Sequence, residues 1–271
     1  MDSSQEIINR YAKEAETYRR DAWLVNFDAE ILFEEFKNII NKLFNSNDNI
    51  KILDIGAGNG MLTEVVLSSF PNAEVTMLDF SSEMLTSAKA IFEVNNISLD
   101  RIKFTVSDFI KNDFPSDKYD LIISSYALHH IRNVSDLKNV YLKISNSLSD
   151  NGTFICLDYY LEKNSDLRKE QTIKAVNKWT QNFNSYETAI EWADIIKSED
   201  TPATISLIIS SIKNCNNVIP ILSPGKGVMA TIYGMTKLNI ERLNEVQLIE
   251  YVDATKKDLG NEALIDAYPF D

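Results

Sequence analysis

The segment that most constrains the fold is an apolar run over residues 50–55, which is followed at once by a glycine-rich turn over 56–60. Glycines at the end of a strand allow a ligand to approach the backbone closely. A dinucleotide fingerprint reads G-x-G-x-x-G, whereas these glycines read G-x-G-x-G and Met61 stands where the last glycine is required. The carboxylate of Asp54 would also repel a pyrophosphate. The turn therefore favours a ligand that carries cationic groups.

Strand and helix patterns alternate along the chain after this turn. Further strands are predicted at 74–79, 102–106, 119–125 and 153–158, with helices from Ser81 and over 137–148. This alternation predicts a parallel sheet covered by helices on both faces. Two β-rich runs, 218–222 and 228–235, flank a Pro/Gly turn and predict an antiparallel hairpin. The expected fold is a doubly wound α/β fold with a mostly parallel seven-stranded sheet.

Composition narrows the classes of partner. The 271 residues carry a formal net charge of −13, which disfavours a nucleic-acid partner because such binding needs Lys and Arg against phosphates. No apolar run approaches the roughly 20 residues of a membrane span. Two cysteines in a chain of this length predict a reduced, cytoplasmic setting. No metal-ligand cluster stands out, so no metal is expected.

The glycine turn resembles motif I of the class I S-adenosylmethionine (SAM)-dependent methyltransferases. The resemblance implies that the turn, including Ala57 and Asn59, approaches the methionine part of SAM. It also implies that Asp54 holds the amino group of SAM, directly or through water. The positions matched to motif I are Asp54, Gly56, Gly58 and Gly60.

The ends of the second and third strands match further positions of this family. Asp79 is expected to bind both ribose hydroxyls of SAM, because one carboxylate can accept two hydrogen bonds. Asp108 is expected to accept from the adenine amino group, and Phe109 to cover the ring. The remaining residues expected at the cofactor are Phe80, Met84, Ser124 and Tyr18.

The loop after the fourth strand is where acceptor and methyl group are expected to meet. It lacks the Asn/Asp-Pro-Pro-aromatic run of nucleobase amino methyltransferases and the Pro-Cys of cytosine C5 enzymes. Its Leu-His-His-Ile form over 128–131 is similar to the small-molecule group. His129 or His130 can serve as a base near neutral pH, or can fix the loop through hydrogen bonds. Tyr126 is a third candidate in the acceptor site.

The resemblance also suggests a division of the chain into functional segments. These are an N-terminal helical lid over 1–45, a SAM-binding core over 46–160, and an inserted helical substrate cap of two or three helices over 161–217. The hairpin over 218–237 completes the core sheet, and a helical tail follows over 238–271.

The expected activity is transfer of a methyl group from SAM to an O or N atom of a small-molecule acceptor. In-line displacement needs mainly proximity and alignment. Three alternatives stay open: a tRNA or protein methyltransferase, an enzyme of this fold that uses SAM differently, and a catalytically silent SAM-binding partner subunit. Oligomeric state is left open, with a homodimer among the alternatives.

Overall fold

The computed structural model describes residues 24–162, 164–199, 202–223, 227–238 and 250–251. Residues 1–23 of the predicted N-terminal lid, which include Tyr18, and most of the predicted C-terminal tail lie outside these residues. Within the predicted tail, Glu250–Tyr251 form the short strand β8 rather than a helix, because they pair with β6.

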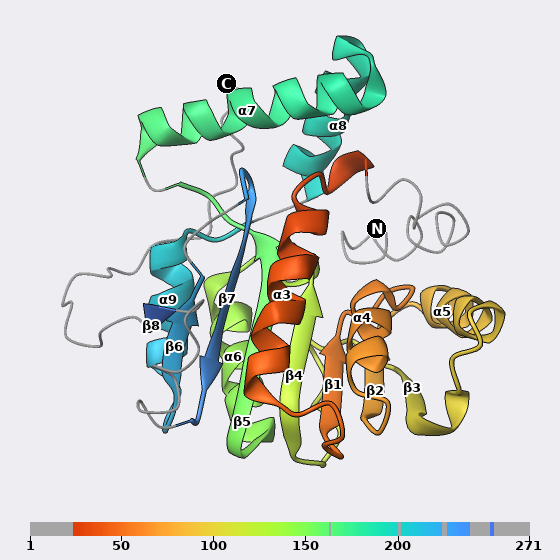
Figure 1. Cartoon of the computed structure of the whole chain (residues 1–271). Coiled ribbons are helices and arrows are strands. Elements are labelled where there is room, and N and C mark those ends of the chain that lie inside the picture. Colours follow the sequence, from red (N-terminus) through yellow and green to blue (C-terminus); the bar gives the residue numbers. More distant parts are fainter. Residues whose placement is uncertain (1–23, 163, 200–201, 224–226, 239–249, 252–271) are drawn as a thin grey trace.

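A single sheet with strand order β3-β2-β1-β4-β5-β7-β6-β8 forms the centre of the molecule (Figure 1). The neighbours from β3 to β5 are parallel, whereas β7 runs antiparallel to both β5 and β6. The seven predicted strands and the antiparallel hairpin are thus confirmed, and β8 adds two residues at the edge. The strands are β1 (Lys51–Ile55), β2 (Glu74–Asp79), β3 (Ile102–Val106), β4 (Tyr119–Ser125), β5 (Leu148–Tyr159), β6 (Ile219–Leu222), β7 (Ala230–Thr236) and β8 (Glu250–Tyr251).

Helices connect β1 to β2, β2 to β3 and β4 to β5, whereas a loop joins β3 to β4. Ser81 caps the helix after β2 by accepting a hydrogen bond from the Met84 backbone N–H. The helix predicted over 137–148 begins earlier, at Val134, because the side chain of Asn133 caps it by accepting from the Asp136 N–H. The helices are α3 (Ala29–Leu43), α4 (Met61–Ser69), α5 (Ser82–Val94), α6 (Val134–Ser147), α7 (Ser165–Phe183), α8 (Tyr186–Glu199) and α9 (Ile205–Lys213).

Each face of the sheet carries its own hydrophobic cluster. Alternate residues of β1 divide between them, with Ile52 in one cluster and Leu53 in the other. Apolar residues of α3, α4 and α5 belong to the first cluster, and those of α6 and α9 belong to the second. Such two-sided burial is typical of parallel sheets. It explains why the strands read as continuous apolar runs.

The segment expected to form a substrate cap contains three helices with different positions. Helix α9 packs against α6 and β6, so it belongs to the wall of the core. Helix α7 crosses the end of the sheet near the start of α3 (Figure 1). Trp179 of α7 donates from Nε1 to the carbonyl of Val25 at 2.8 Å. The position of the chain just before α3 is therefore tied to α7.

Asp28, immediately before α3, ties the same segment to the hairpin. Its Oδ2 accepts hydrogen bonds from the backbone N–H groups of Val228, Met229 and Ala230, at 2.7, 2.8 and 3.3 Å. Burial raises the pKa of Asp28, and these three hydrogen bonds oppose the rise. In the part of the chain described, no helix is long and apolar enough to cross a membrane.

Candidate functional site

A cavity of about 600 Å³ opens at the carboxyl ends of the parallel strands. Ligands of open α/β sheets bind at this edge, next to the switch in strand order. The cavity brings together residues that are far apart in the sequence, from the N-terminal segment to the start of α6. Among the residues predicted for the cofactor, those that line it are Gly56, Ala57, Gly58, Asn59, Asp79, Phe80, Met84, Asp108 and Phe109.

The glycine turn has a backbone that other residues would strain. Gly56, Gly58 and Gly60 have φ angles of +65°, +53° and +82°. A Cβ on Gly56 would stand 2.4 Å from the Cβ of Ala127, so the β1 and β4 loops approach too closely for a side chain. A Cβ on Gly58 would meet nothing within 4 Å, because this residue faces the open cavity. Gly60 does not line the cavity and is instead the N-cap residue of α4.

Asp79 fixes the turn and also faces the cavity. Its Oδ2 accepts from the Gly58 N–H and its Oδ1 from the Ser81 N–H, both at 2.8 Å. Burial raises the pKa of Asp79 to about 6, and these backbone hydrogen bonds oppose the rise. A carboxylate offers about four acceptor positions, and the backbone N–H groups of Gly58, Ser81 and Phe80 act on this one. The remaining acceptor capacity faces the cavity, where the ribose hydroxyls are predicted.

The structure places Asp54 beneath the turn rather than in the cavity. Its Oδ2 accepts from the hydroxyl of Thr63 on α4 at 2.5 Å, and it is not among the lining residues. Burial raises its pKa to about 7; the Thr63 hydrogen bond opposes this and the charge of Asp79 adds to it. Direct contact of Asp54 with a ligand is thus not part of this geometry.

Asn59 presents an unused donor at the cavity. Its side chain is buried, it lines the cavity, and none of the described residues accepts from its Nδ2. A buried donor without an acceptor is costly, of order 1–3 kcal/mol. A ligand oxygen at this position would relieve that cost. This orphaned amide and the open side of Gly58 fit a ligand with a carboxylate or hydroxyl beside the turn.

The loop after β3 carries Asp108 and Phe109 to the opposite wall of the cavity. The Asp108 Oδ1 accepts from the backbone N–H groups of Ile110 and Lys111 at 2.9 and 3.3 Å. Its Oδ2 stands 3.4 Å from the exposed ammonium of Lys111. Phe109 is buried with its side chain on the cavity. The pair thus combines an acceptor with an apolar surface, as an adenine ring needs.

At the end of β4, the residue that lines the cavity differs by one position from the predicted Ser124. Ser124 is fully buried and donates to the carbonyl of Ile55 at 2.8 Å, so it joins β4 to β1 instead of facing the cavity. Its neighbour Ser125 lines the cavity, because successive strand residues point to opposite faces. Tyr126 follows with a φ of +48°, which is strained for a non-glycine residue, and it lines the cavity as predicted.

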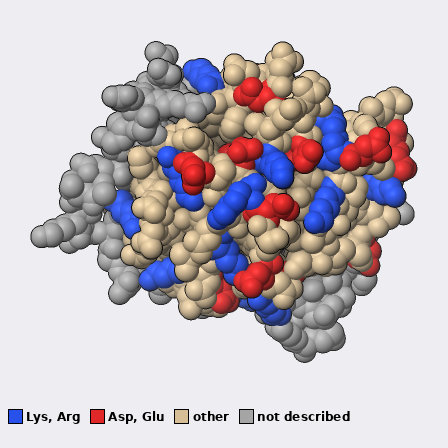
Figure 2. Space-filling view, turned by 90° about the horizontal axis from the view of Figure 1, so that it is seen from below, with Lys and Arg blue, Asp and Glu red and all other residues tan. Residues whose placement is uncertain are grey.

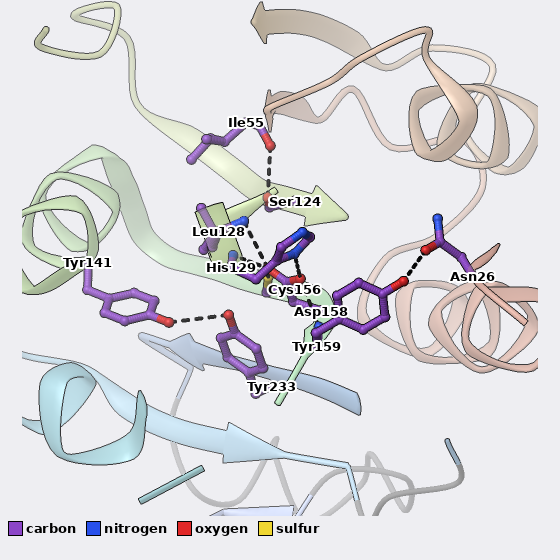
Figure 3. A network of polar contacts seen from close by, with 10 residues as sticks. All are labelled: Asn26, Ile55, Ser124, Leu128, His129, Tyr141, Cys156, Asp158, Tyr159 and Tyr233. Carbon is purple, nitrogen blue, oxygen red and sulfur yellow. Dashed lines mark hydrogen bonds and ion pairs between the residues drawn. The ribbon is translucent and has the colours of Figure 1, made fainter. Parts of the chain in front are cut away.

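The two histidines have different surroundings, and Figure 3 shows those of His129. His129 is buried away from the cavity, with Nδ1 2.5 Å from Asp158 Oδ1. Asp158 also accepts from the backbone N–H groups of Leu128, His129 and Tyr159. A carboxylate accepts hydrogen bonds and does not donate them, so Nδ1 is the donor in this contact. His129 therefore fixes the loop.

His130 is the histidine that lines the cavity. Its ring lies 4.1 Å from that of His129, centroid to centroid, so the fixed ring supports it from behind. A titratable nitrogen at the wall of a cavity can accept a proton from a bound acceptor. The structure thus favours His130 over His129 for chemistry.

Several lining residues were not predicted. Asn26, Ala29 and Phe33 come from the start of α3 and the segment before it. The hydroxyl of Tyr159, at the end of β5, donates to the Asn26 Oδ1 and so holds this side chain. The predicted lid over 1–45 includes these residues, but the sequence carried no signal that singled them out for the cavity. Other unpredicted lining residues are Met61, Ile110, Lys111, Ser125, Ala127, Arg132, Asn133 and Asp136.

A Rossmann-like sheet ending in an antiparallel hairpin, with this cavity at its glycine turn, defines the class I SAM-binding fold. A family described as "Methyltransferase domain" matches residues 46–219, more than half of the chain. The chain belongs to this family, the SAM-dependent methyltransferases, and SAM is its cofactor.

Sequence identity to individual relatives is low. A malonyl-[acyl-carrier protein] O-methyltransferase 2 of Ilyobacter polytropus is 26% identical over 69% of this chain and 67% of its own. A ubiquinone/menaquinone biosynthesis C-methyltransferase of Rickettsia bellii is 27% identical over 72% of this chain and 81% of its own. The solved O-methyltransferase family 2 protein of Planctomyces limnophilus, in complex with apigenin, superposes with a TM-score of 0.58 at 16% identity. That match covers 85% of this chain and 62% of the Planctomyces chain, and it shows the fold alone.

Proposed function

We propose that this protein transfers the methyl group of SAM to an O or N atom of a small-molecule acceptor. The observation that carries the proposal is the single cavity in which the glycine turn, Asp79 and Asp108 face the loop that bears Tyr126 and His130. One wall supplies the groups expected to hold the cofactor. The other supplies an aromatic ring and a base at the place where the acceptor is expected.

The cofactor half of the cavity provides binding and alignment. Bound SAM supplies a methyl group on a sulfonium, which is already a good leaving group. Asp79 accepts from the ribose hydroxyls, Asp108 accepts from the adenine amino group, and Asn59 donates to an oxygen of the methionine part. Holding both reactants in line can contribute several kcal/mol to the rate. Asp54 acts through Thr63 and the turn, and not by touching the cofactor.

The acceptor half removes a proton and excludes water. An O–H or N–H acceptor loses its proton as the bond to the methyl carbon forms, and His130 is placed to accept it. Phe33 and Tyr126 give this side an apolar lining that suits a small organic acceptor. Of the relatives described above, one is named an O-methyltransferase and the other a C-methyltransferase, so their names do not select the acceptor atom.

The charge distribution supports a small-molecule acceptor over RNA. The net charge of −13 disfavours a polyanionic partner. On the face seen in Figure 2, at the end of the sheet away from the cavity, acidic and basic side chains are interspersed without a broad area of one sign. We also place the reaction in the cytoplasm, in keeping with Cys156 and Cys215, which are both buried free thiols. A silent SAM-binding subunit would not need a histidine and a strained tyrosine at the methyl end of the cavity.

The test is a titration followed by a turnover assay. Calorimetry of the purified protein with SAM, S-adenosylhomocysteine (SAH) and NAD should show binding of the first two and none of NAD. Release of SAH is then measured with methyl-labelled SAM and sets of carboxylate, phenol and amine acceptors, with bulk tRNA as a comparison. Acceptor-dependent SAH release with at least one small-molecule set supports the proposal. Binding of NAD alone, or release that requires tRNA, contradicts it.

A further inference from the structure

Lys143 of α6 reaches across to the loop that carries Asp108 and Phe109. Its Nζ donates to three backbone carbonyls of that loop: Phe109 at 3.1 Å, Ile110 at 2.9 Å and Asn112 at 2.7 Å. An ammonium has three N–H donors, so these bonds use all of them. Lys143 is thus a half-buried cation around which the loop is closed.

The same loop is braced by bonds within itself. The Asp108 Oδ1 accepts from the N–H groups of Ile110 and Lys111, and the Asn112 N–H donates to the Asp108 carbonyl at 2.9 Å. The ring of Phe114 lies 5.7 Å from the Lys143 Nζ and adds a cation–π contact. The Asp108 carboxylate therefore has one oxygen committed to the turn, while Oδ2 lies 3.4 Å from the exposed Lys111 ammonium and keeps acceptor capacity for a ligand.

We propose that Lys143 is a positioning residue for adenine recognition: it sets the Asp108 carboxylate and the Phe109 ring so that the cavity selects a 6-amino purine. The proposal rests on the proposed function, because it assumes that the adenine of SAM binds at this loop. Lys143 does not itself line the cavity. It acts through the backbone that carries the two recognition residues.

The physical reason is the convergence of three carbonyl dipoles on one point. Without a cation, three partly negative oxygens would face one another in a half-buried place and lose their hydrogen bonds. The loop would relax by turning its carbonyls toward water. Asp108 and Phe109 would move with it, because both belong to the turn. A change at Lys143 should therefore alter selectivity for the base and not only stability.

The experiment compares two ligands on the same protein. SAH carries the 6-amino group that donates to Asp108, and the S-inosyl analogue carries a 6-oxo group that the carboxylate repels. By calorimetry the wild type should prefer SAH by about tenfold or more, since a site built for a donor rejects an analogue that lacks it. In Lys143→Met, affinity for SAH should fall about tenfold while the ratio between the two ligands shrinks to about threefold or less.

Lys237 offers a matched control. It is also partly buried, its Nζ donates to the carbonyl of Leu148 at 3.0 Å, and burial lowers its pKa as it lowers that of Lys143. It lies after β7, away from the cavity lining. Lys237→Met should change thermal stability and keep the wild-type ligand ratio. If Lys143→Met does not fold, Lys143→Gln keeps a donor and replaces it in the comparison.

Two outcomes would overturn this inference and leave the proposed function intact. One is a folded Lys143 variant with the wild-type ratio between SAH and the S-inosyl analogue. The other is a wild-type protein that binds SAH without preferring it over the analogue. Absence of SAH binding by the wild type would instead overturn the proposed function, and this inference with it.

Discussion

The carboxylate of Asp79 imposes a pH dependence on cofactor affinity. The side chain is buried, it already accepts from two backbone N–H groups, and burial raises its pKa to about 6. Ribose hydroxyls donate to the ionised form, whereas a protonated carboxyl has lost part of its acceptor capacity. The cofactor therefore binds to the fraction of the protein in which Asp79 is ionised.

That fraction sets the size of the effect. With a pKa of about 6, Asp79 is about 90% ionised at pH 7 and about 10% ionised at pH 5. Affinity for SAH should fall about tenfold between these values, or about 1.4 kcal/mol. Below pH 5 the loss approaches a factor of about ten per pH unit. Affinity should fall and not rise as the pH is lowered, because the ionised form of Asp79 that binds the ligand is dominant only above its pKa.

Calorimetry of SAH binding at pH 5, 6, 7 and 8 measures this dependence directly. Asp79→Asn should bind more weakly and show a flat profile between pH 5 and 7. Its amide cannot ionise, and its NH₂ would face the N–H of Gly58 or Ser81. A wild-type affinity that does not change between pH 5 and 7 would refute the reasoning. So would an Asn variant that retains the wild-type slope.

Four further substitutions test other parts of the site. Burial raises the pKa of Asp54 to about 7 in the folded protein, whereas the same group loses its proton near pH 4 in the unfolded chain. The free energy of unfolding of the wild type should therefore fall by up to about 4 kcal/mol as the pH rises from about 4 to about 7. Asp54→Asn should therefore gain stability over the wild type progressively from pH 4 to 7 in denaturant titrations, and a pH-independent difference would contradict this. His130→Ala should slow methyl transfer and spare SAH affinity, whereas His129→Ala should cost about 1–3 kcal/mol of stability; the reverse pattern would exchange their roles. Gly56→Ala should lower both the melting temperature and SAH binding, since its Cβ would meet that of Ala127 at 2.4 Å, and a wild-type melt would show that the turn can adapt.

The sequence predicted the features that depend on local pattern. Alternating strands and helices fixed the sheet and its two covered faces, and the hairpin followed from two β-rich runs around a turn. Asp79 and Asp108 were placed correctly on the cavity because each stands at the end of a strand or in the loop that follows it. The parallel strands all end at the same edge of the sheet, so residues that follow different strands lie close together in the fold.

The errors within the site arose where the local sequence pattern does not show which way a residue faces. Residues 121–123 of β4 are apolar on both faces, so nothing in the sequence showed whether Ser124 or Ser125 would face the cavity. The roles of His129 and His130 could not be separated either. Their difference depends on Asp158, about one helix and one strand further along, whose carboxylate captures the first ring.

Lys143 and Asn26 were missed for a related reason. A lysine on a helix with an otherwise amphipathic pattern is typical of a solvent-facing residue, and its carbonyl partners are more than 30 positions earlier in the sequence. Asn26 reaches the cavity because Tyr159 and Trp179 hold the chain before α3. Both depend on contacts between distant segments, which single-sequence periodicity does not encode.

Each of the two loops that meet at the cavity is held by one side chain that does not line the cavity. The buried Asp158 accepts from the N–H groups of the loop after β4, and the half-buried Lys143 donates to the carbonyls of the loop after β3. Each side chain satisfies several backbone groups at once, so neither loop can shift without leaving some of them unpaired. Methyl transfer from a sulfonium needs alignment more than acid–base power. A cavity whose walls are fixed from behind is suited to that requirement, since little of the binding free energy is spent on ordering the loops.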